Sequence, residues 1–257
     1  MAHVMSQSHP GTMAHRHFGS LLSETAPPSA QTAVPGQYIT GTAADEWIYG
    51  TLGDDTIEGL GGFDQLYAGP GDDMVFGGDG GDKLYCDTGA DTAYGGMSND
   101  VLMGGFGNDV LHGEPGRDHL LGEEGNDTLW GGTGKDILNG GIGADVLLGG
   151  YGWADEFAFV NLNEVGLAPG TRDVIVDFEV GIDKIDLGGI DADAIHNGNN
   201  VFRLSQTALH DGLPGSLRVV VVNGNTYVMA DRDGDKVSDF AIQMEGIHQL
   251  TVSDFYL

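Results

Sequence analysis

Residues 95–139 read GGMSNDVLM, GGFGNDVLH, GEPGRDHLL, GEEGNDTLW and GGTGKDILN, which are five copies of one nine-residue pattern. The same register runs without insertion or deletion through residues 41–148, as twelve repeats of G-G-x-G-x-D-x-U-x in which U is aliphatic. Ten repeats have glycine at position one and ten have it at position four; the exceptions are Ala68 and Cys86, and Ala44 and Ser98. A period this strict predicts a solenoid in which each repeat is one structural unit.

Three residue roles explain the period. Glycines let the backbone adopt positive φ, so the first six residues of each repeat turn tightly. The last three residues suit a very short strand whose aliphatic side chain, at position eight, points inward. Two repeats then make one coil of eighteen residues. The predicted fold class is therefore all-β, with a parallel β-roll as its main part.

The acidic residue at position six returns at the same place on every turn. Successive turns alternate between two edges of the roll, so the carboxylates of each edge are stacked at the strand spacing of about 4.8 Å. One edge carries Asp55, Asp73, Asp91, Asp109, Asp127 and Asp145, and the other carries Glu46, Asp64, Asp82, Asp100, Asp118 and Asp136.

Stacked carboxylates repel one another, and residues 41–148 hold 21 acidic side chains against three basic ones, Lys83, Arg117 and Lys135. A cation is therefore expected between the turns. Oxygen-only ligands and carbonyls exposed by glycine turns favour Ca²⁺ over Mg²⁺, which needs a tighter octahedron, and over zinc, which needs His or Cys. We predict about eight to ten Ca²⁺ ions. The predicted ligands are the eleven aspartates of the two edges, Asp55 to Asp145, turn carbonyls such as those of Gly78, Gly80, Gly105, Gly107, Gly132 and Gly134, and as further candidates Glu46 and Asp155.

The nonapeptide resembles the calcium-binding repeat of RTX (repeats-in-toxin) proteins, which form parallel β-rolls. The resemblance implies that each ion is held by position-six carboxylates and turn carbonyls of neighbouring coils. It also implies a secreted, extracellular protein that leaves the cell through a type I secretion apparatus. An acidic, glycine-rich disordered tract is the alternative that composition alone permits. Twelve in-phase aliphatic residues argue against disorder when calcium is present, whereas disorder is expected without calcium.

The net charge and composition of the whole chain argue against several classes of partner. A formal net charge of −29 and a pI near 4.1 argue against nucleic acid and anionic membrane surfaces. The sequence has no apolar run long enough for a transmembrane helix and no visible Sec-type signal peptide. Cys86 is the only cysteine, so it forms no intramolecular disulfide, and we interpret it as a small residue in a turn.

Composition divides the chain into three parts. Residues 1–40 are predicted to be a disordered leader, residues 41–155 the β-roll, and residues 156–257 a C-terminal β domain. After Gly150 the register gains one residue before Phe157, and short strand patterns follow at 157–160, 174–178, 184–187, 201–204, 217–222, 226–229, 240–244 and 255–257. Asn223-Gly224 is a strong two-residue hairpin signal. The fold is thus a roll followed by a small antiparallel β-sandwich-like cap.

The C-terminal part is similar to the C-terminal domain of serralysin metalloproteases. The similarity lies in residues 173–178 (DVIVDF), 181–187 (GIDKIDL), Ile190-Asp191, 231–235 (DRDGD) with Asp239-Phe240, and the closing Asp254-Phe-Tyr-Leu257. In that family an Asp followed by three hydrophobic residues at the C-terminus belongs to the secretion signal. Such modules also end epimerases, lipases and small Ca²⁺-binding proteins, so the resemblance identifies the module and not a catalytic activity.

An acidic cluster at Asp231, Asp233, Asp235 and Asp239 has two readings. Three alternate carboxylates resemble the start of an EF-hand loop and would bind a further Ca²⁺. However, Lys236 stands where that loop needs glycine, and no bidentate carboxylate follows near position twelve. A solvated hairpin turn is therefore the favoured reading.

No catalytic motif is apparent. The chain has neither the H-E-x-x-H zinc helix of serralysins nor a G-x-S-x-G elbow, and we predict that it is not an enzyme. The favoured function is a secreted calcium-binding protein that folds on extracellular Ca²⁺ and serves in surface or matrix adhesion or as a scaffold, with no membrane insertion. The alternative is a C-terminal export and folding module of a larger serralysin-type metalloprotease or another RTX enzyme.

Overall fold

The structure is a computed structural model that describes residues 35–168, 170–195, 200–205 and 209–257. The described residues all belong to one compact unit, residues 32–257. Most of the predicted leader, residues 1–34, lies outside the described part, so disorder there stays a prediction. Within the last residues of that predicted leader, Tyr38–Thr40 forms strand β1, which pairs with Thr56–Glu58 of the following coil.

Two sheets run the length of the described unit. The first sheet has twelve strands, in the order β1 (Tyr38–Thr40), β3 (Thr56–Gly61), β5 (Met74–Asp79), β7 (Thr92–Met97), β9 (Val110–Pro115), β11 (Thr128–Thr133), β13 (Val146–Leu148), β15 (Val174–Ile175), β20 (Phe240–Met244), β19 (Asn225–Asp231), β18 (Ser216–Val222) and β17 (Arg203–Leu204). The second sheet has nine, in the order β2 (Trp47–Tyr49), β4 (Gln65–Pro70), β6 (Lys83–Thr88), β8 (Val101–Phe106), β10 (His119–Glu124), β12 (Ile137–Ile142), β14 (Glu156–Ala158), β16 (Lys184–Asp186) and β21 (Phe255–Tyr256). Two short 3₁₀ helices, η1 (Leu162–Glu164) and η2 (Val252–Asp254), complete the elements.

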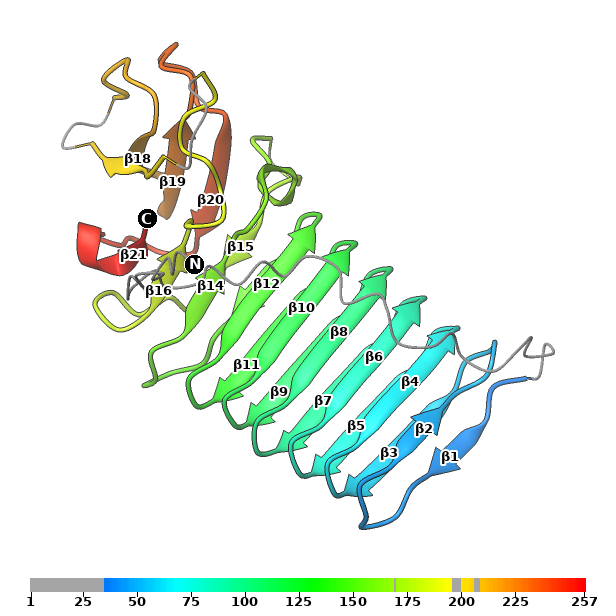
Figure 1. The fold of residues 1–257 in the computed structure, drawn as a ribbon. Coiled ribbons are helices and arrows are strands. Elements are labelled where there is room, and N and C mark those ends of the chain that lie inside the picture. Colours follow the sequence, from blue (N-terminus) through cyan, green and yellow to red (C-terminus); the bar gives the residue numbers. More distant parts are fainter. Residues whose placement is uncertain (1–34, 169, 196–199, 206–208) are drawn as a thin grey trace, which may run out of the picture. The chain divides into compact units, whose positions relative to one another are not determined.

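The roll is wound in the predicted register. Neighbouring strands of each sheet are parallel and lie one coil apart, as in Leu111 opposite Leu129 and Leu120 opposite Leu138. Successive strands in the chain alternate between the two sheets, so the coils stack in chain order (Figure 1). The prediction of an all-β chain with a parallel β-roll is confirmed.

The core is a double column of aliphatic side chains. Every position-eight residue points between the two sheets, and eleven of the twelve are at most 1 % exposed. The twelfth, Ile48, belongs to the first full coil and is 8 % exposed. Burial of one such leucine or isoleucine stabilises the fold by about 1.5–3 kcal/mol. Each strand contributes only one aliphatic side chain to this core. Apolar packing alone therefore stabilises the fold little against the charge repulsion within the chain.

Strands in the roll are longer than the repeat predicts. Strands β3 to β12 each hold six residues, from position seven to position three of the next repeat, and not the predicted three. A residue with positive φ at position two bends each strand; Leu60 (φ 75°) and Glu114 (φ 71°) hold this conformation although they are not glycine. Cys86 also lies within a strand, β6, and not in the predicted turn, and its side chain is fully buried.

Both sheets continue past residue 155. Strands β14, β15, β16, β20 and β21 extend the parallel pairing of the roll, and the antiparallel pairs β18–β19 and β19–β20 extend the first sheet. The predicted hairpin is present, because Val222 faces Asn225 across Asn223 and Gly224, both with positive φ. The C-terminal strands thus cover the last coil of the roll (Figure 1).

Candidate metal centre

The position-six aspartates form two buried ladders, one at each edge of the roll. In each rung, one carboxylate oxygen accepts a hydrogen bond from the backbone N–H of the position-six residue one coil earlier. Asp109 Oδ1 accepts from Asp91 N, and Asp118 Oδ1 accepts from Asp100 N, both at 2.8 Å. The predicted stacking of the carboxylates on two edges is therefore present. The rungs from Asp55 to Asp145 are all at most 3 % exposed.

The ladders continue beyond the regular repeats. Asp155 Oδ1 accepts from Asp136 N at 2.8 Å, across the one extra residue of this coil. Asp173 Oδ1 then accepts a hydrogen bond from Asp145 N at 2.9 Å, and Asp183 Oδ1 accepts one from Asp155 N at 3.0 Å. In both pairs the donor lies 28 residues earlier in the chain. Sequence reasoning missed Asp173 and Asp183 as site residues. The available signal was local: each is followed, two residues later, by an inward aliphatic residue, as in the repeat.

At the other end the first rung is weaker. Glu46 is half-buried, and its Oε2 accepts from Thr42 N within its own turn, at 2.5 Å. Its own N–H donates to Asp64 Oδ1 at 2.8 Å, so Glu46 continues the ladder through its backbone. The longer side chain at the end of the stack therefore folds back on its own turn.

In most ladder aspartates the second carboxylate oxygen has no hydrogen-bond partner among the described residues, whereas Asp55 Oδ2 accepts from Thr51 N and Asp183 Oδ2 accepts from Glu179 N. Such an orphaned buried oxygen normally costs about 1–3 kcal/mol, and more when the group is charged, because its hydration is lost. Twelve aspartates share this feature: the Oδ2 atoms of Asp64, Asp73, Asp82, Asp91, Asp100, Asp109, Asp118, Asp127, Asp136, Asp145, Asp155 and Asp173 are buried and unpartnered. Among the described residues, this column of unpartnered carboxylate oxygens is the strongest indication of cation-binding sites.

Backbone carbonyls converge on these oxygens. A Cβ built on Gly113 would lie 2.7 Å from Asp118 Oδ2 and 2.5 Å from the carbonyl oxygen of Gly131, the same position one coil later. Glycine at position one thus leaves room for two oxygens to face the same small space. Sequence reasoning did not name these position-one carbonyls among the ligands.

The six predicted carbonyl ligands fall into two groups. All six glycines have positive φ, as predicted. At position four, the Gly107 carbonyl and Asp127 Oδ1 lie 1.4 and 2.9 Å from the place of a Cβ on Gly125, so this carbonyl approaches the ladder. At position two, the Gly78 carbonyl lies 2.1 Å from the place of a Cβ on Gly96, and no carboxylate is among the three nearest atoms there. Position-two carbonyls are thus not brought to the ladder by these contacts.

Burial raises the pKa of the ladder carboxyls. Loss of hydration is the largest cause, and repulsion from neighbouring rungs adds to it. The pKa rises to about 7 for Asp91, about 8 for Asp118 and about 9 for Asp173, from ordinary values near 3.8. In the absence of a counter-charge, adjacent rungs at neutral pH therefore hold either unneutralised charge or a proton.

The donor set fits a hard divalent cation. Carboxylate and backbone carbonyl oxygens line both ladders, and their irregular arrangement suits Ca²⁺ better than the strict octahedron of Mg²⁺. Neither His nor Cys donates to the ladder within the described ranges; Cys86 lies nearby, but its burial raises the pKa of the thiol well above its ordinary value. A zinc site is therefore not supported by these residues.

The Asp231 cluster is organised by its own backbone. Asp231, at the end of β19, accepts hydrogen bonds from Gly234 N at 2.6 Å and Lys236 N at 2.9 Å. Carboxylate oxygens of Asp231, Asp233 and Asp239 lie within 4.8 Å of one another, whereas Asp235 is not part of this group. The turn is thus held by carboxylate-to-amide bonds, and both readings of the cluster, a hairpin turn and a further Ca²⁺ site, stay predictions.

The comparisons with known proteins agree with this geometry. Residues 40–75, 49–84, 76–111 and 112–147 match the RTX calcium-binding nonapeptide repeat (4 copies). The chain thus contains RTX calcium-binding repeats, which form its parallel β-solenoid. Repeats of this family bind calcium. No curated protein matches the chain significantly. In the part of the chain that the structure describes, no helix is long and apolar enough to cross a membrane.

Several solved structures are similar to the chain. The AlgE6R2 subunit of the Azotobacter vinelandii mannuronan C5-epimerase is 28 % identical, with a TM-score of 0.42, over 60 % of this chain and 89 % of the subunit. The AlgE6R3 subunit of that epimerase is also 28 % identical, with a TM-score of 0.33, over 62 % of this chain and 78 % of the subunit. The extracellular lipase LipA from Serratia marcescens is 18 % identical, with a TM-score of 0.38, over 89 % of this chain and 41 % of the lipase.

Proposed function

We propose that this chain is a secreted calcium-binding protein whose roll folds when Ca²⁺ occupies the two aspartate ladders. The column of buried, unpartnered Oδ2 atoms carries the proposal. In this proposal Asp55 to Asp145, with Asp155 and Asp173 at the C-terminal end, are the carboxylate ligands. Position-one and position-four carbonyls of neighbouring coils complete the oxygen set.

Calcium binding at these sites is large enough to drive folding. Extracellular-type sites have dissociation constants of roughly 10⁻⁴–10⁻³ M. With free Ca²⁺ at about ten times the dissociation constant, each site contributes about 1.4 kcal/mol. About ten sites would then supply about 14 kcal/mol, which is comparable to the stability of a whole domain. Without the ions, repulsion within a chain of net charge −29 favours the unfolded state.

This coupling suits export in the unfolded state. Free Ca²⁺ is scarce inside cells, so the chain would stay extended and could pass through a type I secretion channel, and it would wind up outside. The C-terminal Asp254-Phe-Tyr-Leu257 would supply the export signal, as its resemblance to serralysin ends implies. In the folded chain Asp254 is the last residue of η2, and Phe255 and Tyr256 form β21, the last strand of the second sheet.

An adhesion or scaffold role is supported by the outer faces of the roll. Position-nine aromatic rings stack along the coils: Tyr49, Tyr67 and Tyr85 follow one another at centroid distances of 5.1 and 4.7 Å. A second row, Phe76, Tyr94 and His112, repeats this on the first sheet at 5.1 and 4.7 Å. Ordered aromatic rows on a regular sheet are suited to contacts with another surface.

Circular dichroism with and without Ca²⁺ tests the proposal. Wild-type chain in millimolar Ca²⁺ should be β-rich, and the same chain in EDTA should lose most of that signal. The double variant Asp109→Ala, Asp127→Ala should need more Ca²⁺ and bind fewer ions by calorimetry. Asp79→Ala, an exposed acid at position three, is the matched control and should behave as wild type. A wild-type chain that is equally β-rich in EDTA would refute calcium-coupled folding.

A further inference from the structure

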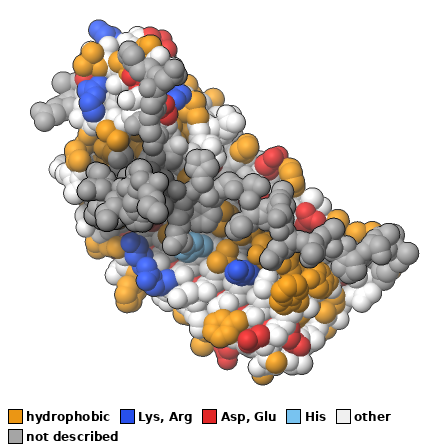
Figure 2. All heavy atoms as spheres, viewed as in Figure 1, with side chains coloured by type: hydrophobic (Ala, Val, Ile, Leu, Met, Phe, Trp, Pro, Cys, Tyr) orange, Lys and Arg blue, Asp and Glu red, His pale blue; other side chains and the backbone are white. Residues whose placement is uncertain are grey.

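The basic side chains of the roll gather on one side. Lys83 lies on β6, and Arg117 and Lys135 lie at position five, in the turns that lead into β10 and β12, so all three lie on or next to strands of the second sheet. None of the three makes an ion pair with another residue that the structure describes, although acidic side chains outnumber them sevenfold in residues 41–148. Figure 2 shows blue basic side chains beside a pale blue histidine on the drawn face of the roll. Lys135 and Arg117 act on Glu156 and Asp136 only at longer range, where each partly offsets the rise in the pKa of that carboxyl, so close ion pairs do not account for these basic groups.

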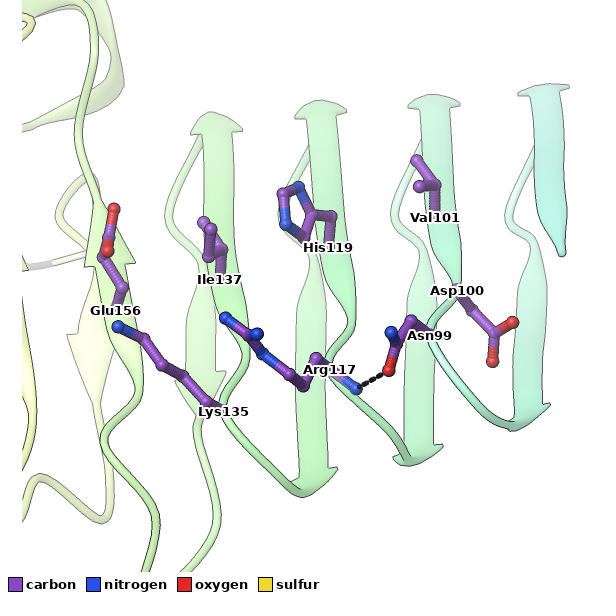
Figure 3. A pocket seen from close by; sticks show the side chains of 8 residues that line it. All are labelled: Asn99, Asp100, Val101, Arg117, His119, Lys135, Ile137 and Glu156. Atoms are coloured by element: carbon purple, nitrogen blue, oxygen red, sulfur yellow. Dashed lines mark hydrogen bonds between the residues drawn. The ribbon is translucent and has the colours of Figure 1, made fainter. Parts of the chain in front are cut away.

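Arg117 and Lys135 line a shallow pocket on the outside of the second sheet. Its volume is about 410 Å³, within the range of small-molecule sites. Asn99, Val101, His119 and Ile137 form the rest of the wall that a ligand would meet. Figure 3 shows the apolar Val101 and Ile137 on the strands, with the two basic side chains extending beneath them.

The backbone fixes the positions from which the side chains of Arg117 and Lys135 extend. Arg117 N donates to Asn99 Oδ1 at 2.9 Å, which ties its turn to the coil before (Figure 3). Lys135 begins one coil further along, about 4.8 Å away by the strand spacing. Both side chains reach in the same direction along the stack, Arg117 toward Ile137 and Lys135 toward Glu156 (Figure 3). Both cationic groups therefore line the pocket, and the Lys135 ammonium lies at the end that holds Glu156.

We propose that this pocket binds a small carboxylated organic molecule, such as a sugar acid. The carboxylate lies on Arg117, whose planar guanidinium offers two parallel N–H donors to a carboxylate, and Lys135 adds a second positive charge. The C–H face of the ligand packs on Val101 and Ile137. This pairing of a charged floor with an apolar wall selects an anion with a hydrocarbon body over a bare inorganic ion.

Two acidic residues also line the pocket, and their charge determines when an anion can bind there. Asp100 belongs to the ladder and is buried, so bound Ca²⁺ would neutralise it. Glu156 remains, and it opposes an anion at the Lys135 end of the pocket. About ten bound Ca²⁺ ions would change the net charge from −29 to about −9, so the anion should bind the calcium-loaded chain and not the calcium-free one.

Calorimetry with D-glucuronate on the calcium-loaded full chain tests the proposal, with glucose as the uncharged control and glucose 6-phosphate as the phosphate arm. We expect a dissociation constant on the order of 1 mM for glucuronate, the weak range proper to an open pocket. Arg117→Gln, which retains the backbone bond to Asn99, should weaken binding by roughly tenfold or more. Glu156→Gln should strengthen binding a few-fold by removing the opposing charge. Lys83→Gln, a basic residue of the same sheet outside the pocket, should bind as wild type.

Several results would overturn the assignment: no heat with glucuronate, equal binding of glucose, preference for glucose 6-phosphate, or an Arg117→Gln chain that binds as tightly as wild type. The inference uses the proposed calcium-coupled folding only to choose the sample. Circular dichroism on that sample separates the two failures, because a folded, calcium-loaded chain that ignores glucuronate refutes the pocket alone. A chain that is also folded in EDTA refutes the folding proposal and leaves the pocket to be judged on its own binding data.

Discussion

Replacing Asp118 with Asn separates the two roles of a ladder rung. Asn retains an oxygen that can accept from Asp100 N, a bond of 2.8 Å in the structure. It replaces the unpartnered Oδ2 with an NH₂ group next to the carbonyl oxygen of Gly131. The charge and one calcium ligand are lost, while the shape and the backbone bond remain. Asp118→Asn therefore has opposite consequences with and without the ion.

The expected magnitudes follow from the contacts. In calcium, the variant loses one or two inter-coil sites, each of which contributes about 1.4 kcal/mol at tenfold excess of ligand. The loss of folding stability should be about 1.4–3 kcal/mol. In EDTA at neutral pH, the new amide donates to the Gly131 carbonyl and the buried charge disappears. The variant should then gain on the order of 1 kcal/mol relative to wild type.

Urea unfolding in calcium and the β-signal in EDTA measure the two effects, and calorimetry counts the ions. Asp79→Asn is the matched control, because this exposed side chain at position three lies outside the ladders. Equal destabilisation of Asp118→Asn in calcium and in EDTA would refute the reasoning, since the carboxylate would then act only through its hydrogen bonds. An unchanged ion count would refute it as well.

Three further perturbations follow from the structure. Ser98 holds φ 89° at a position that is glycine in ten of the twelve repeats, so Ser98→Gly should stabilise the calcium-loaded chain by about 1 kcal/mol, a rise of about 2–4 °C in the melting temperature; a lower melting temperature would contradict this. The pKa values of Asp82, Asp91 and Asp118 rise to about 6, 7 and 8, above the unfolded value, so the folded calcium-free chain binds more protons than the unfolded chain. The β-structure of the calcium-free chain should therefore be present near pH 4 and be lost as the pH rises through 6 to 8. The opposite trend by circular dichroism would refute this. Gly224 has φ 86° in the β18–β19 turn, so Gly224→Ala should cost about 1 kcal/mol in thermal unfolding with an unchanged calcium count; a reduced count would show that the hairpin and the ladders are coupled.

Much of the fold could be predicted because the nine-residue period determines which residues stack on one another. A side chain that returns every nine residues fixes which residues stack, so the ladder from Asp55 to Asp145 and the aliphatic column needed no tertiary information. Strand length did not follow, because the positive φ at position two is compatible with continued sheet pairing. Leu60 and Glu114 show that glycine is not required there, and nothing in the residue types marks the bend.

The C-terminal rungs were missed for a different reason. Asp173 and Asp183 complete the ladders, but each lies 28 residues from its partner and not eighteen. A search by period finds only residues at the period. The inserted segment between β14 and β15 hides the register in sequence, although in space the chain returns to the same edge. The pocket at Arg117 was also invisible, because its residues come from several coils and become neighbours only through stacking.

The inserted segment has a practical consequence. Between β14 and β15 the chain makes an excursion that includes η1, and it still re-enters the winding with Asp173 opposite Asp145 and Val174 opposite Val146. A turn that already accommodates surplus chain without loss of phase is a natural graft point. Foreign peptides placed there should be presented at the rim of a coil, and if the roll folds on calcium as proposed, adding calcium or a chelator would switch that display on or off.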